Sequence, residues 1–156
     1  MAQLSGQPQV FHIDTASRDS TQQIPLGTRA LEANGNEWIY LRGTTAVITG
    51  GWVLIGSAYV TSSAIADDQG RLAIAGTAHT ADTFGWFQIY GQNNTALSRA
   101  AIAANAALFL TSVSGAVDDA DVAGDAIVGA VSLSANVGST TLVDISYPFV
   151  HDIAID

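Results

Sequence analysis

The chain has 156 residues, with five arginines, fourteen acidic residues and no lysine or cysteine, and its formal net charge is −9 at pH 7. This length fits one domain with an arm, and the lack of cysteine excludes disulfides and thiolate metal sites. Phosphate binding needs clustered cations, so we expect no direct nucleic-acid partner. No run approaches the roughly 18 apolar residues of a membrane span, so we expect no membrane contact.

Residues 1–35 differ in composition from the rest of the chain. They are rich in glutamine, serine and threonine, hold two of the three prolines, and contain one short β-type patch at residues 10–13. Such a segment cannot bury enough apolar surface to fold alone. We therefore expect an extended N-terminal arm, anchored on another surface through Val10, Phe11 and Ile13, before a body that spans residues 36–156.

The body consists of short β-type segments separated by turn signals. The Asn34-Gly35 turn precedes the first of them, and the candidates are residues 37–41, 46–49, 52–55, 71–75, 84–91, 108–111, 126–131 and 140–147. Many short strands at such spacing predict an all-β fold, either a compact barrel or a jelly-roll-like sandwich.

One stretch does not follow the strand pattern. Residues 100–110 are rich in alanine, which has the highest intrinsic helix propensity. A single short helix near residues 99–107 is therefore an alternative to a further strand.

Residues 84–90 form the densest aromatic run. A strand there places Trp86 and Phe87 on opposite faces, so both faces are apolar. Such a strand is either central in a two-layer fold or lies half in the core and half at a subunit contact. Trp38, Trp86 and Phe87 are the interface candidates of the body, and Trp52 is a further core candidate.

The strongest candidate for a cation site is the acidic segment 118–125, since calcium prefers several carboxylate oxygens. It lacks the alternation, central glycine and terminal glutamate of an EF-hand loop, so a solvated acidic turn is favoured. The histidines have no neighbours at metal-ligand spacing, and we predict no metal site. The residues considered are Asp118, Asp119, Asp121, Asp125, His12, His79 and His151.

Motifs for catalysis are missing from the sequence. No serine lies in a Gly-x-Ser-x-Gly turn, and neither Gly50-Gly51 nor Gly85 is followed by the helix and lysine of a phosphate loop. The sequence therefore predicts a protein that is not an enzyme, needs no cofactor, and acts by contact.

Several motifs, taken in order, are similar to those of a known group. Ile24-Pro25-Leu26-Gly27-Thr28-Arg29 and then residues 35–41, Gly-Asn-Glu-Trp-Ile-Tyr-Leu, match the opening of small head proteins of tailed bacteriophages, and residues 70–75, 85–91, 114–120 and 147–149 follow in the same order. From Ile24 onward the chain resembles the capsid decoration, or cement, proteins of these phages.

The resemblance implies a small, mainly β homotrimer on the outer surface of the virion. There it would bridge neighbouring subunits of the phage major capsid protein and stabilise the head against the pressure of packaged DNA, without catalytic residues. One alternative is a carbohydrate- or receptor-binding module of a head fibre or tail, with exposed aromatic side chains. Another is an insertion-type domain of a larger coat protein, although Met1 and the coherent arm favour a free-standing product.

Overall fold

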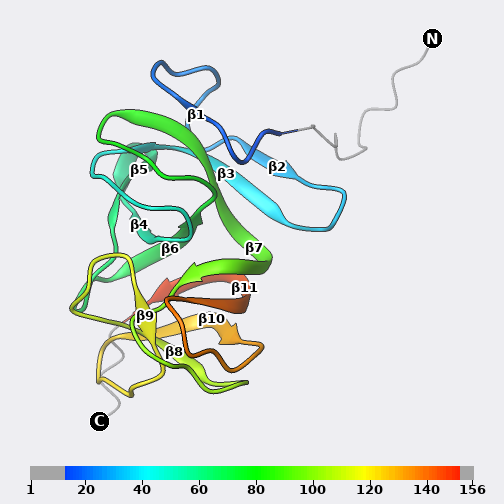
Figure 1. Ribbon diagram of the computed structural model, residues 1–156. Helices are drawn as coiled ribbons and strands as arrows, with labels where there is room; N and C mark the ends of the chain where they lie inside the picture. The colour runs from blue at the N-terminus through cyan, green and yellow to red at the C-terminus, as the bar shows by residue number, and fades with distance from the viewer. Residues whose placement is uncertain (1–12, 152–156) are drawn as a thin grey trace.

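The computed structural model describes residues 13–151 and is mainly β, which confirms the expected fold class (Figure 1). Eleven strands belong to one mixed sheet, and a short 3-10 turn, Ser57–Tyr59, precedes β5. The strands are β1 (Arg18–Asp19), β2 (Arg29–Leu31), β3 (Glu37–Gly43), β4 (Trp52–Ile55), β5 (Val60–Ser63), β6 (Gly70–Ala75), β7 (Thr83–Leu97), β8 (Ala107–Leu110), β9 (Val117–Asp118), β10 (Ala126–Ser132) and β11 (Thr140–Val150). No helix in the described part of the chain is long and apolar enough to cross a membrane.

Five of the strands close into a small barrel. β3 pairs with β7 and, in parallel, with β5, while β4 pairs with both β5 and β6. The ring closes where Ile74 and Ala75 of β6 lie opposite Gln88 and Phe87 of β7. Apolar side chains fill the interior, as expected for a barrel of this size. They are Ile39, Leu41, Val47, Val53, Ile55, Ala73, Ala75, Phe87 and Ile89.

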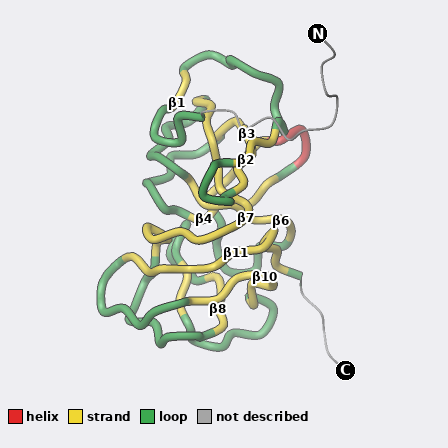
Figure 2. The backbone as a smooth tube through the Cα atoms, turned by 90° about the vertical axis from the view of Figure 1, so that its right-hand side faces the viewer, coloured by secondary structure: helices red, strands yellow, loops and turns green. Residues whose placement is uncertain are grey.

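β7 extends beyond the barrel and begins a second group of strands. Its later residues pair with β11, from Tyr90 opposite Ser146 to Leu97 opposite Thr140, and β10, β8 and β9 follow in turn. Figure 2 shows β11, β10 and β8 as successive levels below β7. The long strand thus belongs to both parts of the molecule.

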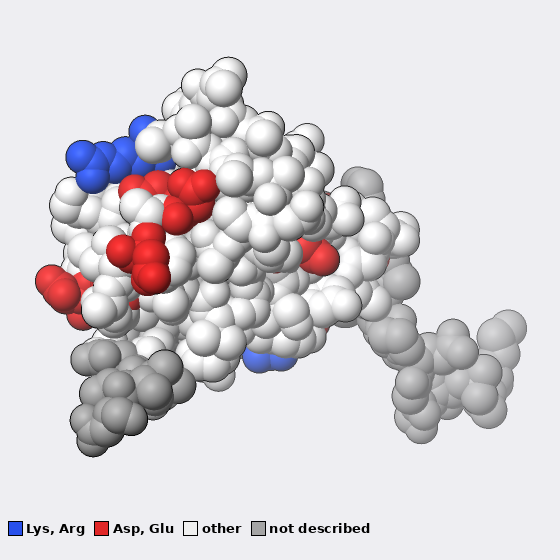
Figure 3. Space-filling model, turned by 90° about the horizontal axis from the view of Figure 1, so that it is seen from below, with Lys and Arg blue, Asp and Glu red and all other residues white. Residues whose placement is uncertain are grey.

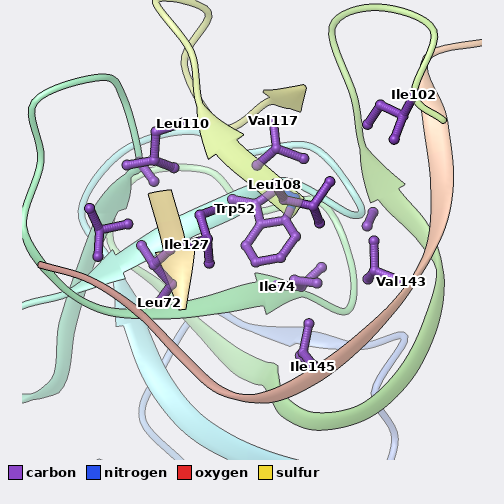
Figure 4. Close-up of a cluster of buried hydrophobic side chains, with 13 residues drawn as sticks. Trp52, Leu72, Ile74, Ile102, Leu108, Leu110, Val117, Ile127, Val143 and Ile145 are labelled. Carbon is purple, nitrogen blue, oxygen red and sulfur yellow. The ribbon is translucent and has the colours of Figure 1, made fainter. Parts of the chain in front are cut away.

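β4 and β6 form a wall between two cores. Along β6, Ala73 and Ala75 face the barrel, whereas Leu72 and Ile74 face a second cluster built around Trp52. Figure 4 shows the Trp52 ring in the middle of that cluster, with side chains from β6, β8, β10 and β11 around it. Since successive strand residues point to opposite faces, a strand with apolar residues on both faces contributes to both cores.

The alanine-rich stretch is not a helix, so the alternative of a short helix near residues 99–107 is wrong. Ile102 forms an isolated bridge with Asn136 and is buried in the second core, and Leu108 and Leu110 enter the same core from β8. Asn105, between them, has φ +58°, which no right-handed helix accommodates. Burial of large apolar side chains at strand spacing has outweighed the helix propensity of alanine.

The described part of the expected arm, residues 13–35, lies along the barrel. β1 pairs with β7, and β2 forms a hairpin with β3, so the boundary expected at residue 35 falls within the turn of that hairpin. Residues of this segment pack on a third cluster outside the barrel. The cluster consists of Ala30, Trp38, Tyr40 and Trp86, with Ile13, Ile24, Leu26 and Phe84 against it.

Candidate functional site

The interface candidates of the body are buried by other residues of the same chain. Phe87 is fully buried in the barrel, where its ring stacks on His79 at 4.7 Å between centroids. Trp38 and Trp86 lie in the outer cluster, with 6% and 9% of their surface exposed. Ile13 packs on the same cluster. Contact of these side chains with another subunit stays a prediction, and Val10 and Phe11 lie outside the described residues.

A different set of aromatic side chains is open to solvent. Tyr59, Tyr90, Tyr147 and Phe149 are each between 38% and 47% exposed. We define the tyrosine–arginine surface as these four residues together with Arg29 and Arg71. Residue patterns alone did not mark these side chains as a site, although Tyr147-Pro148-Phe149 is among the motifs of the resemblance.

Close contacts connect the members of the tyrosine–arginine surface. The rings of Tyr90 and Tyr147 lie 5.5 Å apart, and the Arg29 guanidinium lies 5.6 Å from the centre of the Tyr147 ring. Arg71 lies 5.9 Å from the centre of the Tyr59 ring. These distances fall within the range of cation–π attraction. The surface therefore presents guanidinium groups against aromatic rings.

A shallow pocket connects the two arginines at one end of the barrel. Its volume is ≈ 50 Å³, and Arg29, Arg71 and Tyr147 line it together with barrel residues that include Ile39 and Ile89. Sites that enclose a small molecule are several hundred cubic ångströms in volume. The pocket is thus suited to the tip of one side chain from a larger partner.

The backbone of β11 turns Tyr147 outward. Ile145 lies opposite Ala130 and Phe149 lies opposite Val128, so residues 146–148 face one residue of β10, Gly129. Tyr147 has φ +49°, an uncommon value for a residue with a side chain. A bulge of this kind redirects a side chain out of the regular alternation of the strand. Pro148 follows directly, and its ring restricts the φ angle at the next position of the strand.

Glu37 holds two members of the surface in place. Its carboxylate accepts a hydrogen bond of 2.5 Å from the Tyr147 hydroxyl and forms an ion pair of 3.3 Å with Arg29. The hydrogen bond raises the pKa of Tyr147, so the phenol remains a neutral donor. Arg71, by contrast, has no carboxylate within ion-pair distance among residues 13–151. It is an exposed cation available to an external acidic group.

The acidic segment 118–125 does not converge on a common point. Asp118 and Asp119 accept hydrogen bonds from the backbone amides of Ala120 and Ala103. Asp125, which is buried, accepts one of 2.7 Å from the Asp67 amide. Among the described residues, no three histidine, cysteine or acidic side chains are grouped closely enough to hold a metal ion. Asp118 thus serves its own turn, whereas Asp119 and Asp125 each bind the backbone of a separate segment.

The two described histidines, His79 and His151, are also in different environments. His79 is buried in the barrel, and Thr83 lies 3.1 Å from its Nδ1 atom. Burial and, to a smaller extent, the nearby Arg18 lower the pKa of His79 to about 4. His151 is exposed after β11, and His12 lies outside the described residues.

The opposite end of the molecule from β1 is largely uncharged. Figure 3 shows most of the acidic groups of this face gathered on one side, a wide uncharged area over the rest, and few basic atoms. Such a surface offers no cationic path for a phosphate backbone.

No protein-family model, curated protein or solved structure matches this chain. The geometry describes a small all-β protein with an exposed aromatic and cationic contact surface at the end of a closed barrel.

Proposed function

We propose that the protein is a structural virion protein that binds the outer surface of an assembled phage capsid. It cements neighbouring subunits of the major capsid protein as a homotrimer, and so stabilises the head against internal DNA pressure. The motif resemblance supplies the class of protein, and the tyrosine–arginine surface is the observation that supports action by contact.

The composition of that surface suits a protein partner. Tyrosine and arginine are enriched in protein interfaces, where they supply both buried apolar area and hydrogen bonds. Arg71 is the exposed cation of this surface without an acidic neighbour in the described chain, while the protein as a whole is strongly acidic. We place the capsid contact here, with an acidic group of the major capsid protein opposite Arg71.

Trimerisation would strengthen binding without a strong individual contact. Three linked copies convert the second and third contacts into intramolecular events, so the overall affinity exceeds that of one copy. A closed trimer also matches a symmetric position on an icosahedral shell.

The test is binding of the purified protein to mature shells from which it has been stripped, compared with unexpanded precursor shells. We expect saturable binding to mature shells, better survival of those shells on heating, and a trimer mass in free solution. Failure to bind either kind of shell would contradict the proposal.

A pair of charge reversals tests the contact surface. Arg71→Glu should weaken shell binding by at least tenfold, because it places an acidic group against the acidic partner. Arg99→Glu is the matched control. Arg99 is exposed, contacts Ser112, and is not part of the tyrosine–arginine surface. Equal binding by the two variants would place the capsid contact elsewhere.

A second candidate function is carbohydrate or receptor binding by a head fibre or tail module. The observation that favours it is the exposed pair Tyr90 and Tyr147, whose rings are tilted by 36° and separated by 5.5 Å. It predicts retention of the isolated protein on a glycan surface, and loss of that retention in Tyr90→Ala. Binding to shells without measurable binding to glycans would exclude this second function.

A further inference from the structure

A second and larger pocket lies on the outer side of the barrel. Its volume is ≈ 330 Å³, and it lies between the segment that precedes β2 and the strands β3 and β7. We call it the outer pocket. Its lining residues include the aromatic rings of Tyr40 and Trp86 and the apolar side chains of Ile13, Ile24 and Ala30.

Polar side chains that line the outer pocket already have hydrogen-bond partners. The Tyr40 hydroxyl donates to the Asp19 carboxylate at 2.6 Å and accepts a hydrogen bond of 3.3 Å from the Gln23 amide. Asp14, Thr28 and Arg29, which also line the pocket, are bonded to groups elsewhere in the chain. A polar ligand would have to displace these bonds, whereas the aromatic and aliphatic side chains of the lining suit an apolar group.

The size of the outer pocket suits an aromatic ring. A cavity of about 150 Å³ lined by apolar side chains accepts benzene, and this one is larger and open at one side. Apolar surface left beside an empty space loses its dispersion contacts, so filling it stabilises the fold.

The first described residue of the chain lines this pocket. Ile13 packs on the outer cluster, and a turn fixed by Asp14, whose side chain accepts a hydrogen bond from the Ala16 amide, follows at once. Two residues of chain span at most about 7 Å, so Phe11 is within covalent reach of the pocket that Ile13 lines.

We propose that the outer pocket binds the Phe11 side chain of the same chain. Bound there, the Phe11 ring joins the outer cluster, against which Ile13, Ile24 and Leu26 already pack. This assignment concerns the folding of a single chain and is independent of the proposed capsid role.

Cysteine cross-linking tests the assignment in the full-length protein, because the chain has no cysteine of its own. We would pair Val10→Cys with Gln23→Cys, since Gln23 lines the outer pocket and Phe11 stays intact. Oxidation at low protein concentration should give an intrachain disulfide as the main product, identified by mass and by mobility on a non-reducing gel. Adding Phe11→Ala should reduce its yield several-fold.

A matched pair controls for chance encounters. Gln3→Cys with Gln23→Cys has the same chemistry farther along the segment and should cross-link several-fold less. A yield equal to that of the first pair, or no disulfide from either pair, would overturn the assignment. Cross-linked dimers or trimers would overturn it as well, because the pocket would then receive a neighbouring copy.

A stability measurement gives an independent readout. Phe11→Ala should lower the melting temperature by about 5 °C or more, the scale expected for the loss of a packed ring in a domain of this size. Leu4→Ala, a large apolar residue in the same segment, should leave it unchanged. Equal melting of Phe11→Ala and the unmodified protein would contradict the proposal.

Discussion

The hydroxyl of Tyr40 in β3 donates a hydrogen bond of 2.6 Å to the carboxylate of Asp19 in β1. The Tyr40 ring is buried, and burial together with this carboxylate raises the pKa of Tyr40 to about 12. The bond joins the segment before β2 to the barrel wall. It thereby holds residues 13–31 over the outer cluster.

Replacement of Tyr40 by phenylalanine should weaken this attachment. We expect a loss of about 2 kcal/mol in the free energy of unfolding, the usual scale for a hydrogen bond to a charged group. Urea denaturation at pH 8 measures it. Tyr90→Phe, at an exposed ring, is the control and should change stability by less than about 0.5 kcal/mol.

The same variant should change the alkaline response of stability. The pKa of Tyr40 is higher in the folded chain than the value of 10 in the unfolded chain, so its contribution is complete below pH 10. That contribution is lost as the pH rises from 10 through 12. Denaturation midpoints that fall equally steeply in this range for Tyr40→Phe would contradict the assignment.

His79 should make the protein sensitive to mild acid. Its pKa is about 4 when folded and 6.5 when unfolded, so between these values the unfolded chain binds a proton that the folded chain does not. The contribution of neutral His79 to the free energy of unfolding is fully present above pH 6.5. It declines as the pH falls toward 4, by up to about 3 kcal/mol. Unfolding measurements across this range, compared with His79→Gln, isolate the effect.

The titration can also be followed without a variant. The imidazole protons of His79 should show no chemical-shift change between pH 7 and 5 in the folded protein, and should begin to titrate near pH 4. A midpoint near 6.5 in the native spectrum would show that the ring is accessible and would refute the predicted acid sensitivity.

Alanine substitutions at three glycines distinguish the cost of backbone strain from the cost of steric overlap. Gly50 has φ +79°, and a Cβ atom there would overlap the backbone carbonyl of Thr95 on β7. Gly35 has φ +90° with nothing near the added atom, and Gly138 has neither constraint. Alanine should cost at least about 3 kcal/mol at Gly50, about 1 kcal/mol at Gly35, and almost nothing at Gly138. Any other order, measured by denaturation, would be inconsistent with the packing of the 50–51 turn on β7.

Trp86 should be important for stability. Trp86→Ala removes a ring that packs edge-on against Tyr40 at 5.4 Å and lines the outer pocket. We expect a loss of about 3 kcal/mol in the stability of the fold or trimer. Tyr147→Ala, at an exposed ring, should cost less than about 1 kcal/mol. Unchanged melting and oligomer size in Trp86→Ala would contradict this role.

The strand content could be predicted from the sequence because it depends on local alternation. Residues 37–41, 52–55 and 71–75 lie within β3, β4 and β6. The closure of the barrel could not be predicted, since it depends on pairing between β3 and β5 and between β6 and β7, which residue patterns do not specify. The alanine-rich stretch stayed open between helix and strand, because intrinsic propensity takes no account of the core that receives Ile102 and Leu108.

The candidate surface was harder to predict than the core. The sequence analysis selected the densest aromatic run, and dense aromatic runs fill cores, as Phe87 does. The exposed tyrosines are scattered along the chain, and Tyr147 points outward because of a bulge in β11. A bulge depends on the register of two strands, and single-sequence patterns do not contain it.

The double-faced wall makes the chain unequally tolerant of insertions. One residue added within β6 would turn Leu72 and Ile74 toward the narrow barrel and leave alanines to fill the space around Trp52. Both cores would be disrupted at once, since β6 contributes Leu72 and Ile74 to one and Ala73 and Ala75 to the other. The turn at Asn34-Gly35 contributes to neither of these two cores. Insertions and deletions among related chains should therefore accumulate there and be absent from residues 70–75.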